Sequence, residues 1–236
     1  MDRVAVIVMA RAVAEYIPLM FRGMERWTRE PRRVFVLAND CPDSEGAAFR
    51  AAWEPSWNAL TRVQYLTTGV PLFPRVATAE RAAHLARVRN HAIEWALGFE
   101  WEWGLIFDTQ KHLPKAGLAK LLARNVDIVA PLSLYPRVGF YDVWCTHHLD
   151  GSRFKHNDWT GPELEEVASV GGTVLVKRAV FDAGCRYGGT DGTDCDSVPF
   201  CGQARERGFK VYLDRSVIST CCLDVGAYRA LVEAEA

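Results

Sequence analysis

The chain has 236 residues, 49% of them hydrophobic and 24% charged, with a formal net charge of −1. Such a chain can bury a large core, but its balanced charge gives no general electrostatic attraction to nucleic acid or acidic membranes. No apolar run approaches the about 18 residues that indicate a transmembrane helix, so we expect a cytoplasmic protein.

Strand and helix patterns alternate over the first part of the chain. Short apolar runs predict strands, and apolar residues at helical spacing predict the helices between them. In chain order the pattern predicts a strand at 4–9, a helix at 14–27, strands at 33–37 and 61–66, a helix at 78–97, a strand at 103–107, a helix at 114–124 and a strand at 127–131. This alternation favours one Rossmann-like α/β domain with a mainly parallel central sheet flanked by helices.

The pattern changes after residue 131. Residues 132–167 are rich in Tyr, Trp, His, Asp and Gly without clear periodicity, and they predict loops with short strands. A strand at 169–176, a helix at 197–207 and a last strand at 210–218 follow, and the tail 223–236 predicts a short surface helix.

The cysteines of the chain are scattered, and no Cys-x-x-Cys pair occurs among them. A structural zinc site is therefore not expected. Free cysteines are commonly buried, so we expect reduced and mostly buried thiols. The chain has seven: Cys41, Cys145, Cys185, Cys195, Cys201, Cys221 and Cys222.

The strand predicted at 103–107 runs directly into Asp108. In open α/β sheets, ligands bind outside the carboxyl ends of the strands. A carboxylate there can hold a metal ion or a ribose hydroxyl. The alternative is a turn aspartate or a helix N-cap.

The surrounding segment WGLIFDTQKHLPKAGLAKLLARNVDIVAPL resembles the GT-A glycosyltransferase pattern of a strand, Asp-x-Asp, a proline-initiated helix and a strand starting Asp-Ile-Val. In that family the Asp-x-Asp pair holds a divalent metal that bridges the donor diphosphate. Asp108 matches the first acid, and Gln110 stands in place of the second. Because an amide is a weaker oxygen ligand, the resemblance implies a manganese or magnesium ion that binds only with the donor.

The helix predicted at 78–97 carries a second donor-side feature. Arg89 falls inside its apolar stripe, and a buried guanidinium needs an anionic partner, either a structural carboxylate or a donor phosphate. The run containing Arg89 and Asn90 is similar to the Arg-Asn stretch near the nucleotide in many GT-A enzymes. Ala10 and Asp40, after the first two strands, are assigned to the same donor side.

Residues 166–219 resemble the C-terminal half of GT-A enzymes, with Gly-Gly, a strand, an acidic loop and a helix that ends Ala-Arg-Glu-x-Gly-Phe-Lys-Val. The family's acidic loop supplies a catalytic or acceptor-binding carboxylate. Asp196 sits at the best-matching place and Asp194 is next. The alternative is that the aspartates of this Gly-rich loop only form turns.

The stretch FYDVWCTHHLDGSRF at 140–154 is similar to one in fungal capsule-type α-mannosyltransferases. This resemblance places Asp142 and Trp144 against a donor or acceptor sugar and favours retention of configuration. The GT-A resemblance of the C-terminal half places Gly171 and Gly172 on the acceptor side. As a whole, the GT-A resemblance implies a single domain with a nucleotide-sugar half at 1–131, an acceptor-side half at 132–222 and a tail at 223–236.

The sequence therefore predicts a hexosyl- or pentosyltransferase that uses a nucleotide diphosphate sugar and an acceptor of unidentified class. Arg89 and a cation at Asp108 would neutralise the diphosphate, and Asp194 or Asp196 would serve as the catalytic carboxylate. The family's third metal ligand is often a His near the last strand, but residues 217–222 contain none. This absence is a further reason to expect an ion only with the donor.

Two other functions stay open. A nucleotidyltransferase needs a Gly-rich basic loop after the first strand, where residues 10–13 read Ala-Arg-Ala-Val. A degenerate, non-catalytic GT-A domain that binds a nucleotide sugar would explain Gln110.

Overall fold

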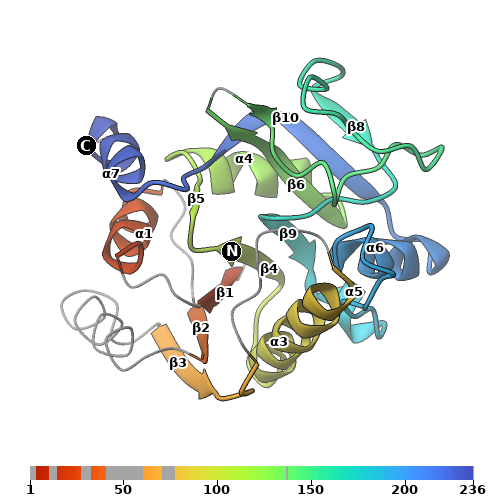
Figure 1. Ribbon diagram of the computed structural model, residues 1–236, viewed down its shortest axis with the longest axis horizontal. Coiled ribbons are helices and arrows are strands. Elements are labelled where there is room, and N and C mark those ends of the chain that lie inside the picture. The colour runs from red at the N-terminus through yellow and green to blue at the C-terminus, as the bar shows by residue number, and fades with distance from the viewer. Residues whose placement is uncertain are drawn as a thin grey trace.

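The computed structural model describes residues 4–10, 15–27, 33–40, 61–70, 78–136 and 138–235. Their strands form one central sheet (Figure 1). The strands are β1 Val4–Ala10, β2 Arg33–Asn39, β3 Thr61–Leu66, β4 Trp103–Asp108, β5 Lys111–His112, β6 Ile128–Tyr135, β7 Gly139–Phe140, β8 Leu164–Glu166, β9 Val174–Lys177 and β10 Val211–Cys221. Their order is β3-β2-β1-β4-β9-β6-β10-β5, with β7 beside β6 and β8 beside β10.

The half of the sheet built from β1 to β4 is parallel. β1 pairs with β2 and with β4, and β2 pairs with β3. Ala10 lies opposite Ala38, and Met9 lies opposite Asp108, so these strands end at one edge. Because the chain places β2 on one side of β1 and β4 on the other, a topological switch point lies between the ends of β1 and β4, the usual ligand position in such sheets.

The other half of the sheet is mixed, which corrects the prediction of a mainly parallel sheet. β9 runs antiparallel to both β4 and β6, and β5, β7 and β8 are also antiparallel to their neighbours. The chain runs from β6 through β7 and β8 to β9 without a helix in between, and it enters β9 antiparallel to β6 and β4. β9 is also shorter than the strand predicted at 169–176, since Gly172 has a φ of +70°.

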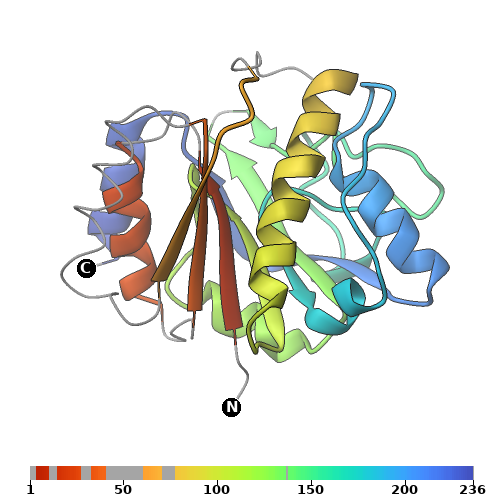
Figure 2. The ribbon, with the colours of Figure 1, turned by 90° about the horizontal axis from the view of Figure 1, so that it is seen from below.

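Helices cover both faces of the sheet (Figure 2). α1 Ile17–Glu25, α4 Gly117–Arg124 and α7 Val225–Ala234 pack on one face, and α3 Ala79–Leu97, α5 Arg178–Asp182 and α6 Ser197–Glu206 pack on the other. The alternation of side chains along β1 separates the two cores: Val4, Val6 and Val8 face the first layer, and Ala5 and Ile7 face the second.

The predicted helices exist, with adjusted ends. α3 begins after Thr78, whose side chain accepts a hydrogen bond from Arg81 N at 3.2 Å. α4 begins three residues later than predicted, because Pro114 and the residues after it form a turn closed by Gly117 N and Pro114 O at 2.7 Å. The expected start of the first helix at residue 14 lies outside the described residues.

The C-terminal tail is more integrated than a surface helix. α7 packs against α1, with Tyr228 and Val232 fully buried. The Tyr228 hydroxyl donates a hydrogen bond to Lys111 O at 2.8 Å, which ties the tail to β5. None of the helices that the structure describes is long and apolar enough to cross a membrane.

Candidate active site

Asp108 is the last residue of β4 and lies at the switch point. Its side chain is 35% exposed, and Arg89 Nη2 lies 3.7 Å from its Oδ1. No hydrogen bond to this carboxylate comes from any described residue. Burial raises the pKa of Asp108, an effect that Arg89 and Lys111 offset in part. A partly exposed carboxylate that accepts no hydrogen bond from the described residues is poorly suited to a structural role and is available to a ligand.

Arg89 connects Asp108 to the acidic loop. Its side chain is 13% exposed, and Nη1 contacts both carboxylate oxygens of Asp196. Burial opposes its charge, but Asp196 and Asp108 outweigh that effect and hold the pKa of Arg89 well above its ordinary value. The prediction that Arg89 packs against an anion is confirmed, and the partner is a carboxylate 107 residues away.

A second buried ion pair lies beside Asp108. Lys111 is 2% exposed, and its Nζ lies 3.1 Å from Asp142 Oδ2 and contacts the hydroxyl of Ser133. Gly172 explains the tight fit, because a Cβ there would lie 2.6 Å from Asp142 Oδ2. Asp142 and Gly172 therefore lie together, but Asp142 is only 8% exposed and is held by Lys111, so its contact with an acceptor stays a prediction.

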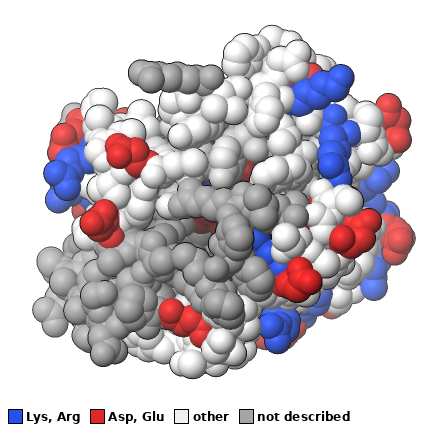
Figure 3. Space-filling view, in the orientation of Figure 1, with Lys and Arg blue, Asp and Glu red and all other residues white. Residues whose placement is uncertain are grey.

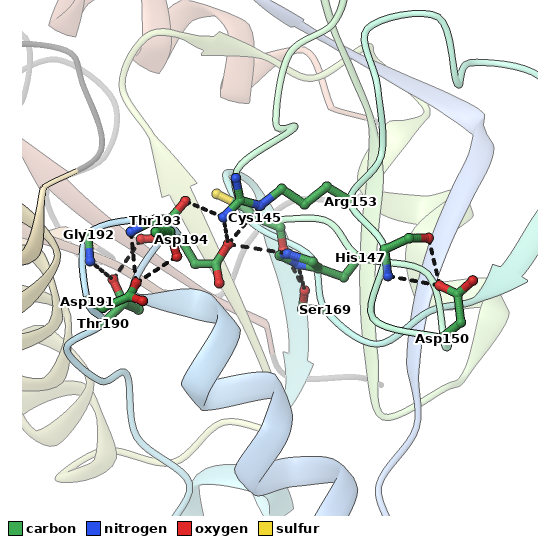
Figure 4. A network of polar contacts seen from close by, with 11 residues as sticks. Cys145, His147, Asp150, Arg153, Ser169, Thr190, Asp191, Gly192, Thr193 and Asp194 are labelled. Atoms are coloured by element: carbon green, nitrogen blue, oxygen red, sulfur yellow. Dashed lines mark hydrogen bonds and ion pairs between the residues drawn. The ribbon is translucent and has the colours of Figure 1, made fainter.

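Only one oxygen of the Asp194 carboxylate, Oδ1, is bound by described side chains (Figure 4). Its Oδ1 accepts hydrogen bonds from Arg153 Nε at 3.0 Å and Nη2 at 2.6 Å, and His147 Nε2 lies 3.3 Å away. The other ring nitrogen of His147 lies 2.8 Å from the Ser169 hydroxyl. The Oδ2 of Asp194 has no partner in the part of the chain that the structure describes. With 25% of its side chain exposed, Asp194 keeps one oxygen for a ligand.

Two predicted donor-binding residues make local contacts instead. Both ends of the Asn90 amide bind the backbone of Tyr187 at 2.9 Å, so Asn90 holds the segment before the acidic loop. The Asp40 carboxylate accepts hydrogen bonds from Thr68 N at 2.6 Å and Gly69 N at 2.9 Å. These contacts give both side chains a structural role, and their contact with the donor stays a prediction.

The remaining predicted residues lie around the same strand ends. Ala10 is the buried last residue of β1, and the carbonyl of Gln110 accepts a hydrogen bond from Cys222 N at 2.8 Å. Trp144 is 41% exposed, and its carbonyl accepts a hydrogen bond from Cys195 N at 3.1 Å. Gly171 lies against Cys145, whose Cβ would be 2.3 Å from a Cβ at this glycine. Close approach of the backbone thus explains this glycine as it explains Gly172.

The described side chains around Asp108 do not provide enough ligands to hold a metal ion by themselves. Among the described residues, no group of three His, Cys, Asp or Glu side chains could hold a metal ion. Gln110 is neutral, and Cys221 and Cys222 at the end of β10 are buried thiols. Hard divalent cations prefer several oxygen ligands. Asp108 alone therefore fits only an ion that takes most of its ligands from a bound diphosphate and water.

Sequence reasoning did not identify three residues of this site: Lys111, His147 and Arg153. Lys111 lies in a stretch with no periodicity, so nothing in the pattern indicated its burial. Arg153 and His147 come from the long segment 141–173, whose path depends on contacts with the acidic loop. The only available signal was the pair of basic residues in the stretch resembling a mannosyltransferase.

No family model and no curated protein sequence matches this chain. Solved structures do match it. S. aureus TarS 1–349 has a TM-score of 0.59 at 13% identity, covering 99% of this chain and 65% of that one. GalNAc-T7 with UDP, GalNAc and Mn2+ has a TM-score of 0.61 at 12% identity, covering 94% and 44%. The mannosyltransferase PcManGT from Pyrobaculum calidifontis, with GDP-Man and Mn2+, has a TM-score of 0.61 at 18% identity, covering 97% and 59%.

These neighbours are GT-A glycosyltransferases, and the likeness shows that this chain has the same kind of α/β fold. At such low identity it shows the fold alone. The chain also spans less than two thirds of each neighbour, and only 39% of full-length TarS.

Proposed function

We propose that this protein transfers a sugar from a nucleotide diphosphate sugar to an acceptor hydroxyl. The observation that carries the proposal is the position of Asp108 at the switch point of the sheet, where its carboxylate accepts no hydrogen bond from the residues that the structure describes. The fold supports it, since the neighbours include complexes with UDP and with GDP-Man. In this proposal residues 1–131 form most of the donor side and residues 132–222 form the acceptor side.

The donor side carries more negative than positive charge, and a bound cation would balance it. The carboxylates of Asp108, Asp142 and Asp196 outnumber the cations of Arg89 and Lys111, so the ionised cluster carries a net negative charge. A diphosphate entering alone would be repelled. We therefore infer that manganese or magnesium arrives with the donor and that Asp108 is its charged protein ligand. When bound, such an ion neutralises the leaving diphosphate.

On the acceptor side we assign the general base to Asp194. The acceptor hydroxyl would give its proton to the Oδ2 of Asp194, while Arg153 and His147 hold Oδ1 in place. Asp196 has both oxygens on Arg89 and is 1% exposed, so it serves to position Arg89. Trp144 lies nearby with an exposed ring that could cover a sugar.

This assignment differs from the retention that the stretch 140–154 favours. A base that takes the acceptor proton during a single displacement inverts the anomeric carbon. The anomeric configuration of the product, read by NMR from the coupling constant of the new glycosidic bond, therefore tests the role of Asp194 separately from the function itself.

A turnover assay tests the proposed function. Purified protein is mixed with a panel of nucleotide sugars, manganese and mixed acceptors, and released nucleoside diphosphate is measured. We expect release from one donor, at a rate that rises with the correct acceptor. A donor that binds without release across a broad acceptor panel would instead support the non-catalytic GT-A alternative. The nucleotidyltransferase alternative depends on residues 10–13, of which 11–13 lie outside the described residues.

A further inference from the structure

Two cysteines meet inside the proposed site. Cys145 follows Trp144, and Cys195 lies between Asp194 and Asp196. The backbone joins the two segments, because Cys195 N donates to Trp144 O at 3.1 Å. Because Trp144 directly precedes Cys145, this backbone bond places Cys195 next to Cys145, and the Cys195 side chain is the largest cause of the raised pKa of the Cys145 thiol. Figure 4 shows Cys145 beside the acidic loop, close to Asp194 and Arg153.

The surroundings of the pair give the two sulfurs different roles. Cys145 is 8% exposed and is enclosed by Gly171, where a Cβ would lie 2.6 Å from its Sγ. The Cys195 side chain and burial raise the pKa of Cys145. Cys195 is more exposed, so an external reagent meets it first. The other described cysteines, Cys185, Cys201, Cys221 and Cys222, are buried.

We propose that Cys145 and Cys195 form an oxidative modification site, which a small disulfide such as oxidised glutathione converts into an intramolecular disulfide. The Cys195 thiolate attacks one sulfur of the reagent and releases one thiol. Cys145 then loses its proton and attacks the Cys195 sulfur, releasing the second thiol. Two protein thiols are oxidised and one reagent disulfide is reduced to two thiols, so atoms and electrons balance.

The new bond would alter the proposed acceptor side. A disulfide brings its sulfurs to about 2 Å, closer than two separate thiols. Since Cys195 stands between Asp194 and Asp196, the contraction displaces the loop that carries both carboxylates. A misplacement of about 1 Å at a reacting group costs on the order of 10²-fold in rate. We therefore expect oxidation to slow transfer by that factor and reduction to restore it, a consequence that rests on the proposed function.

Mass spectrometry tests the site without any activity measurement. Reduced protein is treated with oxidised glutathione, remaining thiols are blocked with N-ethylmaleimide, and the digest is searched for linked peptides. Trypsin leaves Cys195 and Cys201 in one peptide, so cleavage before Asp196 or fragment spectra must separate them. We expect the loss of two free thiols and a peptide linking Cys145 to Cys195, both reversed by dithiothreitol.

Variants sharpen the test. Cys145→Ser should stop at the mixed disulfide on Cys195, and Cys195→Ser should keep Cys145 reduced. Three results with the wild type would overturn the proposal: a stable mixed disulfide, unreacted thiols, or a link to another cysteine. Because these results come from the wild-type protein, the test holds even if a variant fails to fold. An intact link without a change in transfer would overturn only the consequence for the rate.

Discussion

Replacing Asp108 with Asn is expected to cut sugar transfer by at least about 10²- to 10³-fold, the scale of losing one charged contact to a transition state. The variant loses the only charged protein ligand that we assign to the donor's cation, while the shape of the side chain is kept. Asp108→Ala should be at least as inactive. Nucleoside diphosphate release under saturating donor measures the effect.

The same variant should not lose stability at neutral pH. The pKa of Asp108 is raised in the folded state, so its contribution to stability is present below the unfolded pKa and is lost as the pH rises through the folded one. Ionised Asp108 therefore costs stability at pH 7, and Asp108→Asn should melt at the same temperature or higher. The difference should vanish below about pH 4, near the ordinary pKa of aspartate.

Thermal unfolding at pH 7 and below about pH 4, together with turnover, distinguishes a ligand-binding role of Asp108 from a structural one. Asp182→Asn is the control. Asp182 is exposed on α5, and its one ion pair with a described residue is that with Arg178, so its loss should change neither turnover nor stability. A markedly lower melting temperature for Asp108→Asn would show a structural carboxylate. Wild-type turnover would remove Asp108 from the site.

Asp194→Asn is expected to slow transfer by roughly two to four orders of magnitude, the range for a positioned general base. The amide keeps an oxygen for Arg153 but cannot take the acceptor proton. Donor binding should be unchanged, because Asp108 and Arg89 are untouched. Asp191→Asn is the matched control, since Asp191 lies in the same loop and, among the described residues, its carboxylate accepts hydrogen bonds from Thr193 alone.

The outcome of the Asp194 test also discriminates between the carboxylates of the loop. Normal turnover of Asp194→Asn with an inactive, folded Asp196→Asn would transfer the role of base to Asp196. If both variants turn over normally, the loop only forms turns, and Asp142 becomes the next candidate.

The sequence predicts β1, β2 and β4 to within two residues at each end because a strand buried on both faces is a continuous apolar run. It does not predict the direction of β9, since hydrophobic periodicity is the same in parallel and antiparallel pairs. That direction depends on the long return from β6, whose path is fixed by contacts between distant segments.

The same limit applies to the site. The helical wheel predicts that Arg89 is buried, but it cannot select Asp196 from among the acidic residues. The strand-end rule places both Asp40 and Asp108 at the same edge of the sheet. Asp40, however, binds the backbone at Thr68 and Gly69 after β3, whereas Asp108 accepts no hydrogen bond from the described residues. Only the arrangement of backbone N–H groups around each carboxylate distinguishes them.

Nucleoside diphosphate binding tests the central claim most directly. UDP, GDP, ADP and CDP are titrated into the protein by calorimetry, without and with manganese, and manganese is also titrated alone. A bound ligand of the folded state should also raise the melting temperature. We predict that manganese alone does not bind at micromolar concentrations, and that one diphosphate binds stoichiometrically, more tightly with manganese and only weakly to Asp108→Asn. A tight manganese site in donor-free protein would show that the metal ligands are misplaced, and no binding of any diphosphate would contradict a nucleotide-sugar-dependent transferase.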